Sequence, residues 1–208
     1  SMIKLYYSPG SCALASHIAL EEAGADYEAV RIDFGLDEQK KPDFLAINPK
    51  GRVPALVTDK GILTETPAIL IFISQTYPAS SLAPVNDPWA LAQAQAFNSY
   101  LCATVHVAHA HGGRGHRWAD KETSFEDMRQ KVSQTVGDCF TLIENDYLKG
   151  PWVLGDTYSI CDMYLYTVSR WLERDRVDIS NFPKVKAQFE AIEKRPAVAR
   201  VLENHFTN

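Results

Sequence analysis

Hydrophobic and polar positions follow two different patterns along the chain, and the change falls near residue 80. In the first part, short runs with the two-residue period of strands alternate with longer runs that have helical spacing. Ile3, Leu5 and Tyr7, for example, alternate with Lys4 and Tyr6. Strands are predicted over 3–7, 27–33, 55–58 and 62–63, and helices over 11–23 and 68–76.

Strand signals vanish beyond the segment 79–88, which is rich in Pro, Ser, Asn and Asp. The later hydrophobic spacing predicts helices over 89–111, 124–148, 159–173, 182–194 and 196–204. The third of these is predicted to begin at a capping box formed by Ser159 and Asp162. The first elements have the order βαβ and then ββα. We therefore expect an α/β N-terminal domain over residues 2–80, a linker over 81–88 and an all-helical C-terminal domain over 89–208.

Composition narrows the possible functions. The net charge is −5, with 21 basic and 26 acidic residues, and this argues against a nucleic-acid binder, which needs a basic face. No apolar run reaches the length of a membrane span, and no secretory signal is visible. The four cysteines, at 12, 102, 139 and 161, lack metal-binding spacing. This usage predicts a reducing, cytoplasmic setting and no bound metal.

The segment YYSPGSCALA, residues 6–15, is the most informative one. It closes the first strand, turns at Pro-Gly, and opens a helix with Ser11 and Cys12 in its first turn. Unpaired N–H groups and the helix dipole at that position favour a thiolate. A lowered pKa of the Cys12 thiol is therefore expected. The same geometry would equally hold the thiolate of a bound ligand.

Two further motifs lie in the predicted N-terminal domain. In NPKGRVPAL, residues 48–56, Pro54 precedes a strand, and a cis Val53–Pro54 bond would leave the Val53 backbone free to pair with an extended peptide. In LTETPAI, residues 63–69, Thr66 is predicted to cap a helix and Glu65 could accept an ammonium group. Glu65 and Thr66 together suit the zwitterionic end of an amino acid.

In combination, these motifs resemble those of the glutathione S-transferases, and the resemblance covers essentially the whole chain. Within that superfamily the chain is most similar to the bacterial beta class, whose signature SPG-x-C-x-LASHI is found here at residues 8–18. The resemblance implies a thioredoxin-like N-terminal domain, glutathione as co-substrate, a role in detoxification and a homodimer.

The resemblance also implies a role for each matching residue. Val53 and Pro54 would bind the cysteinyl part of glutathione, and Glu65 and Thr66 its γ-glutamyl end. Cys12 would lie close to the glutathione sulfur, where a mixed disulfide can form. Two further roles complete the expected set: His106 lining the cleft, and Tyr7 and Arg52 binding glutathione.

The chain departs from the beta-class pattern after the cysteine, where Ala13 replaces the common serine. Ser8, Ser11 and Cys12 therefore compete for the role of stabilising the glutathione thiolate. The useful contribution is a donated hydrogen bond, from O–H, S–H or a backbone N–H. Ser11 and Cys12 are favoured, and the choice stays open.

Histidines, arginines and a tryptophan gather between residues 106 and 118. His106 and His109 share a helix face, yet no further ligand completes a metal shell at useful spacing. One interpretation is that the histidines pack against the first domain and the helix end. The other is that His109, Arg114 and Trp118 line a second-substrate pocket that favours an anionic or aromatic electrophile.

The predicted function is conjugation of the glutathione thiolate to small hydrophobic electrophiles. Two alternatives remain open. The chain could be a glutathione-dependent monothiol disulfide reductase or peroxidase that uses Cys12, or a non-catalytic binder of glutathione or a hydrophobic ligand.

Overall fold

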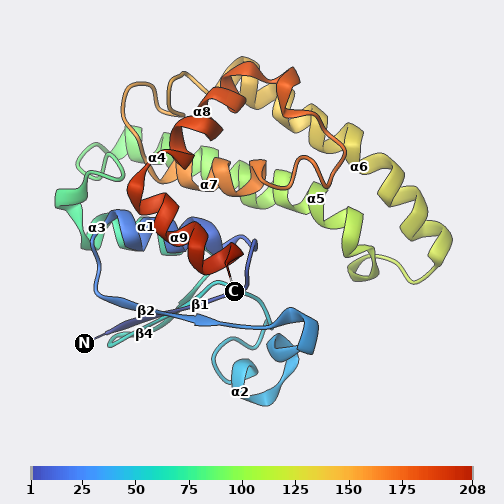
Figure 1. Cartoon of the computed structure of the whole chain (residues 1–208), viewed down its shortest axis with the longest axis horizontal. Helices are drawn as coiled ribbons and strands as arrows, with labels where there is room; N and C mark the ends of the chain where they lie inside the picture. The colour runs from blue at the N-terminus through green and yellow to red at the C-terminus, as the bar shows by residue number, and fades with distance from the viewer. Residues whose placement is uncertain (1, 208) are drawn as a thin grey trace.

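The protein folds into a four-stranded sheet with helices, followed by a helical C-terminal domain (Figure 1), and the structure, a computed structural model, describes residues 2–207. The strand order is β2-β1-β3-β4. The central strand β1 (Ile3–Tyr7) pairs in parallel with β2 (Tyr27–Arg31) and antiparallel with β3 (Ala55–Thr58). The edge strand β4 (Gly61–Thr64) pairs antiparallel with β3. This arrangement confirms the predicted α/β N-terminal fold.

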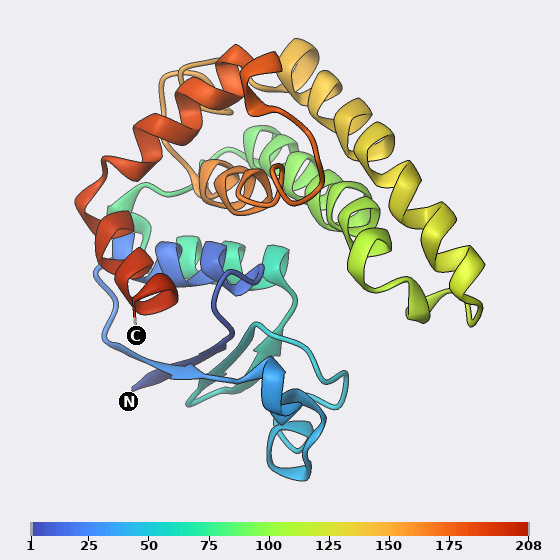
Figure 2. The ribbon, with the colours of Figure 1, turned by 45° about the vertical axis from the view of Figure 1, so that its right-hand side comes forward.

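Helix α1 (Ala13–Glu22) lies between the sheet and the C-terminal helices (Figure 2). Its residues 13–20 are all buried, because one side faces the sheet and the other faces the helical domain. Helix α3 (Thr66–Thr76) packs beside α1 on the same face of the sheet. The short helix α2 (Pro42–Leu45) covers the opposite face, where the ring of its Phe44 packs edge-on against Tyr6.

The C-terminal domain contains only helices and turns within the described residues. Helices α4 (Pro88–Tyr100) and α5 (His106–Gly113) form one rod, joined by the π-helical turn η4 (Leu101–Val105). The helices that follow are α6 (Glu122–Leu142) with the π-helical turn η6 (Ile143–Tyr147), α7 (Ile160–Ser169), α8 (Pro183–Glu193) and α9 (Pro196–Phe206). Single 3₁₀ turns complete the chain: η1 (Phe34–Leu36), η2 (Glu38–Lys40), η3 (Pro78–Ser80), η5 (Gly115–Arg117) and η7 (Ile179–Asn181).

Helix α7 begins with the predicted capping box. The Ser159 hydroxyl accepts the Cys161 N–H at 3.1 Å, and the Asp162 carboxylate accepts the Ser159 N–H at 2.9 Å. The other carboxylate oxygen of Asp162 accepts the Val153 N–H at 2.8 Å. These bonds fix the buried helix against the preceding loop.

Several predicted boundaries differ from the structure, and three of them lie close to the contact between the domains. The first helix begins at Ala13, not at residue 11, and the long helix continues through Gly112 and ends at Gly113. Helix α7 ends at Ser169, four residues early, because the chain then turns toward the N-terminal domain. None of the helices in the described part of the chain has both the length and the apolarity that a membrane span requires.

Candidate functional site

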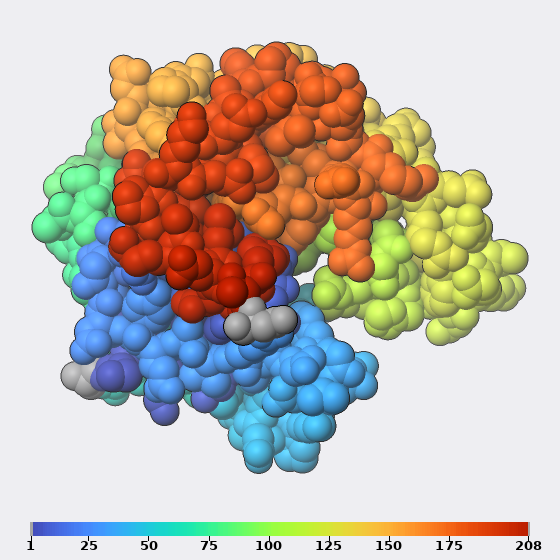
Figure 3. Space-filling view, in the orientation of Figure 1, coloured from blue at the N-terminus to red at the C-terminus, as the bar shows by residue number. Residues whose placement is uncertain are grey.

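A cleft of about 1060 Å³ lies between the two domains. Figure 3 shows the hollow between the N-terminal domain below it, α5 and the following turn on one side, and the segment after α7 above it. All the predicted site residues except Tyr7 and Ser8 line this cleft. The lining residues among them are Ser11, Cys12, Arg52, Val53, Pro54, Glu65, Thr66, His106, His109, Arg114 and Trp118.

The turn between β1 and α1 forms the base of the cleft. Gly10 has a φ of +73°, a conformation that glycine adopts without steric cost. The Ser11 hydroxyl donates to the Ser8 carbonyl at 2.7 Å and accepts the Ala13 N–H at 3.3 Å. The Ser11 proton is therefore engaged within the turn. Ser8 is buried beneath it, with its side chain away from the cleft.

The predicted low pKa of the Cys12 thiol is wrong. Cys12 occupies the N-cap position with a helical backbone, and its thiol donates to the Val53 carbonyl at 3.5 Å instead of meeting the free N–H groups of α1. Burial raises the pKa of the thiol, while a hydrogen bond with Thr66 and the charge of Arg114 lower it to a smaller extent. Cys12 therefore stays protonated at neutral pH.

The start of α3 forms a second part of the wall. Glu65, with a φ of +77°, occupies the N-cap position, and Thr66 is the first helical residue. The prediction of Thr66 as N-cap is thus wrong by one residue, and no side chain caps the helix. The Glu65 carboxylate pairs with the Lys50 ammonium, which also donates to the Thr64 hydroxyl at 2.9 Å. A carboxylate and uncapped helix N–H groups lie side by side here, as a zwitterion requires.

The Val53–Pro54 segment connects these two parts. Its peptide bond is cis, as one of the predicted alternatives had it. Val53 is 7% exposed, and its carbonyl accepts the Cys12 thiol. The three motifs of the sequence therefore meet at one end of the cleft.

Two side chains of the helical domain hold the Gly10 turn. The Gly10 N–H donates to Nδ1 of His205 at 3.1 Å, and the Gly10 carbonyl accepts the indole N–H of Trp171 at 2.9 Å. Both groups are distant in the sequence, and no pattern near the motif predicts them. Neither His205 nor Trp171 is among the predicted site residues.

His205 is supported in turn by a buried histidine. Because Nδ1 of His205 accepts the Gly10 N–H, its proton lies on Nε2, which donates to Nδ1 of His17 at 3.0 Å. Burial lowers the pKa of His17 to about 4 and that of His205 to about 3, so both rings are neutral. Tyr7 packs against both rings and donates to the Asn204 carbonyl at 3.3 Å. Tyr7 lies outside the cleft, away from its predicted glutathione-binding position.

Trp171 is held by the histidines of α5. The ring of His109 stacks on the indole at a centroid distance of 4.3 Å, and Nδ1 of His109 bonds the Asp175 carboxylate at 2.6 Å. His106 contacts the other side of this group, 4.9 Å from the indole centroid, and burial lowers its pKa to about 4. These histidines pack within the helical domain, not against the first domain. His109 and Asp175 thus support the Gly10 turn through Trp171.

The opposite wall has a different character. Arg114 and the exposed Trp118 follow the end of α5, and Trp118 stacks on His111 at a centroid distance of 3.8 Å. In residues 2–207, no group of three or more His, Cys, Asp and Glu side chains has an arrangement that could hold a metal ion. The predicted second-substrate residues His109, Arg114 and Trp118 all border the same space as Cys12.

Comparisons with known proteins agree with this geometry. Residues 1–75 match the glutathione S-transferase N-terminal domain, and residues 109–205 match the C-terminal domain of the same family. Glutathione S-transferase GstA of Escherichia coli O157:H7 is 32% identical over 204 residues, which cover 96% of this chain and 97% of that protein.

Solved structures give the same result. A glutathione transferase homologue from Sulfitobacter, crystallised with bound glutathione, has a TM-score of 0.95 and 46% identity and covers 98% of both chains. The beta-class glutathione S-transferase of Sphingomonas chungbukensis has a TM-score of 0.86 and 31% identity, over 99% of this chain and 100% of that one. This chain therefore belongs to the glutathione S-transferase family of enzymes.

Proposed function

We propose that the enzyme binds glutathione at the Cys12 end of the cleft and transfers its thiolate to a small hydrophobic electrophile. One observation supports this proposal above the others: Cys12, Val53 and the Glu65–Thr66 pair border a single space, and Cys12 contacts the Val53 carbonyl there. The Val53 backbone would pair with the cysteinyl unit. Glu65 and the start of α3 would hold the ammonium and carboxylate of the γ-glutamyl unit.

The raised pKa of Cys12 suggests how it acts. A thiol that keeps its proton could turn its single hydrogen bond from the Val53 carbonyl to the glutathione thiolate once glutathione binds. Free glutathione has a thiol pKa of about 8.5 and is mostly un-ionised at neutral pH. Lowering that pKa by about 2 units requires roughly 2.7 kcal/mol of preferential thiolate binding. The Cys12 S–H is the donor that borders this position.

The same raised pKa argues against Cys12 as the nucleophile of a monothiol reductase or peroxidase, since the attacking species in that chemistry is a thiolate. The transferase is therefore the favoured function, and reductase activity and ligand binding without turnover are outcomes that the test below separates from it.

The test combines two assays on the wild type and on Cys12→Ser and Cys12→Ala. Conjugation of glutathione to 1-chloro-2,4-dinitrobenzene should fall about tenfold in Cys12→Ala and less in Cys12→Ser, which keeps a donor. Glutathione-dependent reduction of bis(2-hydroxyethyl) disulfide should be weak in all three. Strong disulfide reduction that both variants lose would favour the reductase. Glutathione binding by calorimetry without conjugation of any electrophile would favour the binder.

We also propose that the enzyme works as a homodimer in the cytoplasm, in detoxification. The four cysteines are unpaired in the structure, as in a reducing compartment. The proposal of a homodimer rests on the resemblance to the glutathione S-transferase family. Analytical ultracentrifugation should give twice the chain mass of 23.3 kDa.

A further inference from the structure

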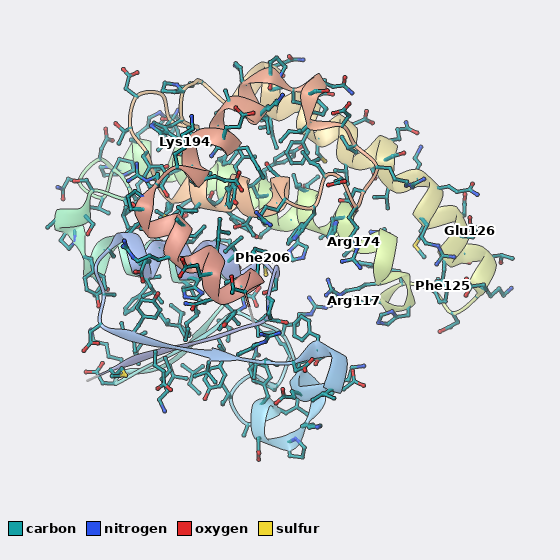
Figure 4. The ribbon with its side chains drawn as sticks, viewed as in Figure 1. Arg117, Phe125, Glu126, Arg174, Lys194 and Phe206 are labelled. Atoms are coloured by element: carbon teal, nitrogen blue, oxygen red, sulfur yellow. The ribbon has the colours of Figure 1, made fainter. Side chains whose placement is uncertain are left out.

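We propose that the electrophile is a small aromatic carboxylate, whose charge is bound by Arg114, Arg117 and Arg174 on the helical wall of the cleft. This inference rests on the proposed transferase function and names its second substrate class. Figure 4 shows Arg117 and Arg174 on the α5 side of the cleft, with Phe206 across from them at the end of α9. The three arginines come from two separate segments, one after α5 and one after α7.

The charges that line the cleft are unbalanced. Seven arginines border it, against three carboxylate side chains, those of Glu65, Glu126 and Asp175. Glu65 is already paired with Lys50, and Asp175 with His109. Glu126 pairs with Arg129. The carboxylates of the cleft are therefore engaged, and none forms an ion pair with Arg114, Arg117 or Arg174.

Three of the seven arginines are engaged within the protein. Arg129 pairs with Glu122 and Glu126, Arg170 pairs with Glu193, and Arg176 donates to the Arg129 carbonyl. The other four form neither an ion pair nor a side-chain hydrogen bond with any part of the chain from residue 2 to residue 207. These four are Arg52, Arg114, Arg117 and Arg174.

Arg117 is also close enough to Arg52 and Arg114 for their positive charges to repel its own. The pKa of Arg117 is lowered to about 10, first by burial and then by the charges of Arg52 and Arg114. His106, on the same wall, is kept neutral by burial and by its cationic neighbours. A bound carboxylate would relieve this repulsion and accept the charge-assisted hydrogen bonds that a guanidinium forms in pairs.

Glutathione alone does not account for four guanidinium groups. It carries two carboxylates, and in the proposed binding mode the γ-glutamyl one lies at the start of α3. Its glycyl carboxylate can take Arg52, which directly precedes Val53 in the N-terminal domain. The remaining three arginines all belong to the helical domain, where the second substrate would bind.

Aromatic surfaces border the same space. Trp118 stacks on His111, Trp171 lies beside the Gly10 turn, and Phe206 ends α9 beneath the guanidinium of Arg170. Flat apolar faces next to cationic groups suit a planar molecule with one anionic substituent. This combination reconciles a hydrophobic electrophile with a charged wall.

The test compares two electrophiles that differ only in charge, 4-chloro-3-nitrobenzoate and 4-chloro-3-nitrobenzamide. Each kcat/KM is divided by the uncatalysed rate constant with glutathione, which corrects for intrinsic reactivity. We expect the wild type to prefer the anion by about tenfold or more, as one charge-assisted hydrogen bond allows. The double variant Arg117→Gln/Arg174→Gln should lose that preference and retain its KM for glutathione. Arg200→Gln, which removes an equal charge that pairs with Glu21 outside the cleft, should keep the preference.

A second measurement does not depend on turnover. With S-methylglutathione bound, calorimetric titration should show 4-nitrobenzoate binding about tenfold more tightly than 4-nitrobenzamide, and equally in the double variant. Equal binding or turnover of the two members of a pair by the wild type would overturn the inference. So would a rise in the KM for glutathione in the double variant, since the arginines would then serve glutathione. If the enzyme conjugates none of the three electrophiles, including 1-chloro-2,4-dinitrobenzene, the transferase proposal itself fails. The titration still decides in that case whether the anion site exists.

Discussion

The two walls of the cleft differ in whether their polar groups already have partners within the protein. On the thiol side, the Gly10 turn is held by bonds within the protein, with its N–H on His205 and its carbonyl on Trp171. On the helical side, Arg114 and Arg117 have no partner within residues 2–207. The first wall therefore fixes a geometry before any ligand arrives, and the second provides charge that only a ligand can neutralise. Changes to the first should cost stability, and changes to the second should alter substrate preference.

The largest expected effect is the loss of stability of the thiol-side wall in acid. The folded pKa values of about 4 for His17 and about 3 for His205 lie below the unfolded value of 6.5, so only the unfolded chain takes up these protons as the pH falls. The stabilisation is complete above pH 6.5 and is lost below it, by about 1.4 kcal/mol per histidine for each pH unit. Urea unfolding between pH 7 and pH 5 measures it. His205→Asn should make the slope shallower, and an unchanged slope would contradict the assignment.

His205→Ala at pH 7 should be the next largest effect. It removes the acceptor of the partly buried Gly10 N–H and the donor to His17 at once, so a loss of about 2–4 kcal/mol in the free energy of unfolding is expected. His205→Asn is the control, because its amide oxygen can stand where Nδ1 accepts from Gly10. Equal losses in the two variants would show that the bond to Gly10 contributes little.

Trp171→Phe should have a smaller effect, of about 1 kcal/mol, because it keeps an aromatic ring beside His109 and removes only the N–H that binds the Gly10 carbonyl. That carbonyl belongs to the turn that positions Cys12. The rate of conjugation should therefore fall by more than the small drop in melting temperature alone would explain. Trp89→Phe, at a residue that is 72% exposed, provides the control.

The smallest effect on stability is expected for the helical wall. Arg114 lies near other arginines and forms no ion pair within residues 2–207, so Arg114→Gln removes no stabilising contact. The free energy of unfolding should therefore change by less than about 0.5 kcal/mol. Thermal denaturation in low salt measures it. A loss as large as that of His205→Ala would mean that Arg114 is structural, and the contrast between the walls would fail.

The sequence predicted what local patterns determine. The alternation at Ile3, Leu5 and Tyr7 identified β1, and the Ser159–Asp162 capping box marked the start of α7. The meeting of Cys12 with Val53 was also anticipated, although only through the family resemblance.

The features that the sequence missed depend on the direction of a side chain or on contacts between residues far apart in the chain. The pKa of Cys12 was mispredicted because the helix begins two residues later than expected, so the thiol is buried against the Val53 carbonyl, and burial raises its pKa. The bond from Gly10 to His205 joins residues 195 positions apart, and neither has a neighbour whose spacing signals it. The arginines after α5 were visible in the sequence, but their lack of partners becomes apparent only when every carboxylate is placed.

The two bonds of Gly10 also limit how this enzyme can be recombined. The domain boundary near residue 80 suggests that whole domains could be exchanged between relatives, with each domain keeping its own structure. Yet a single residue of the first half, Gly10, takes its N–H partner from the last helix and its carbonyl partner from the segment after α7. A chimera would therefore inherit a well-shaped thiol site only if the donor of the helical half supplies a tryptophan and a histidine at matching places, whatever the overall identity of the two parents.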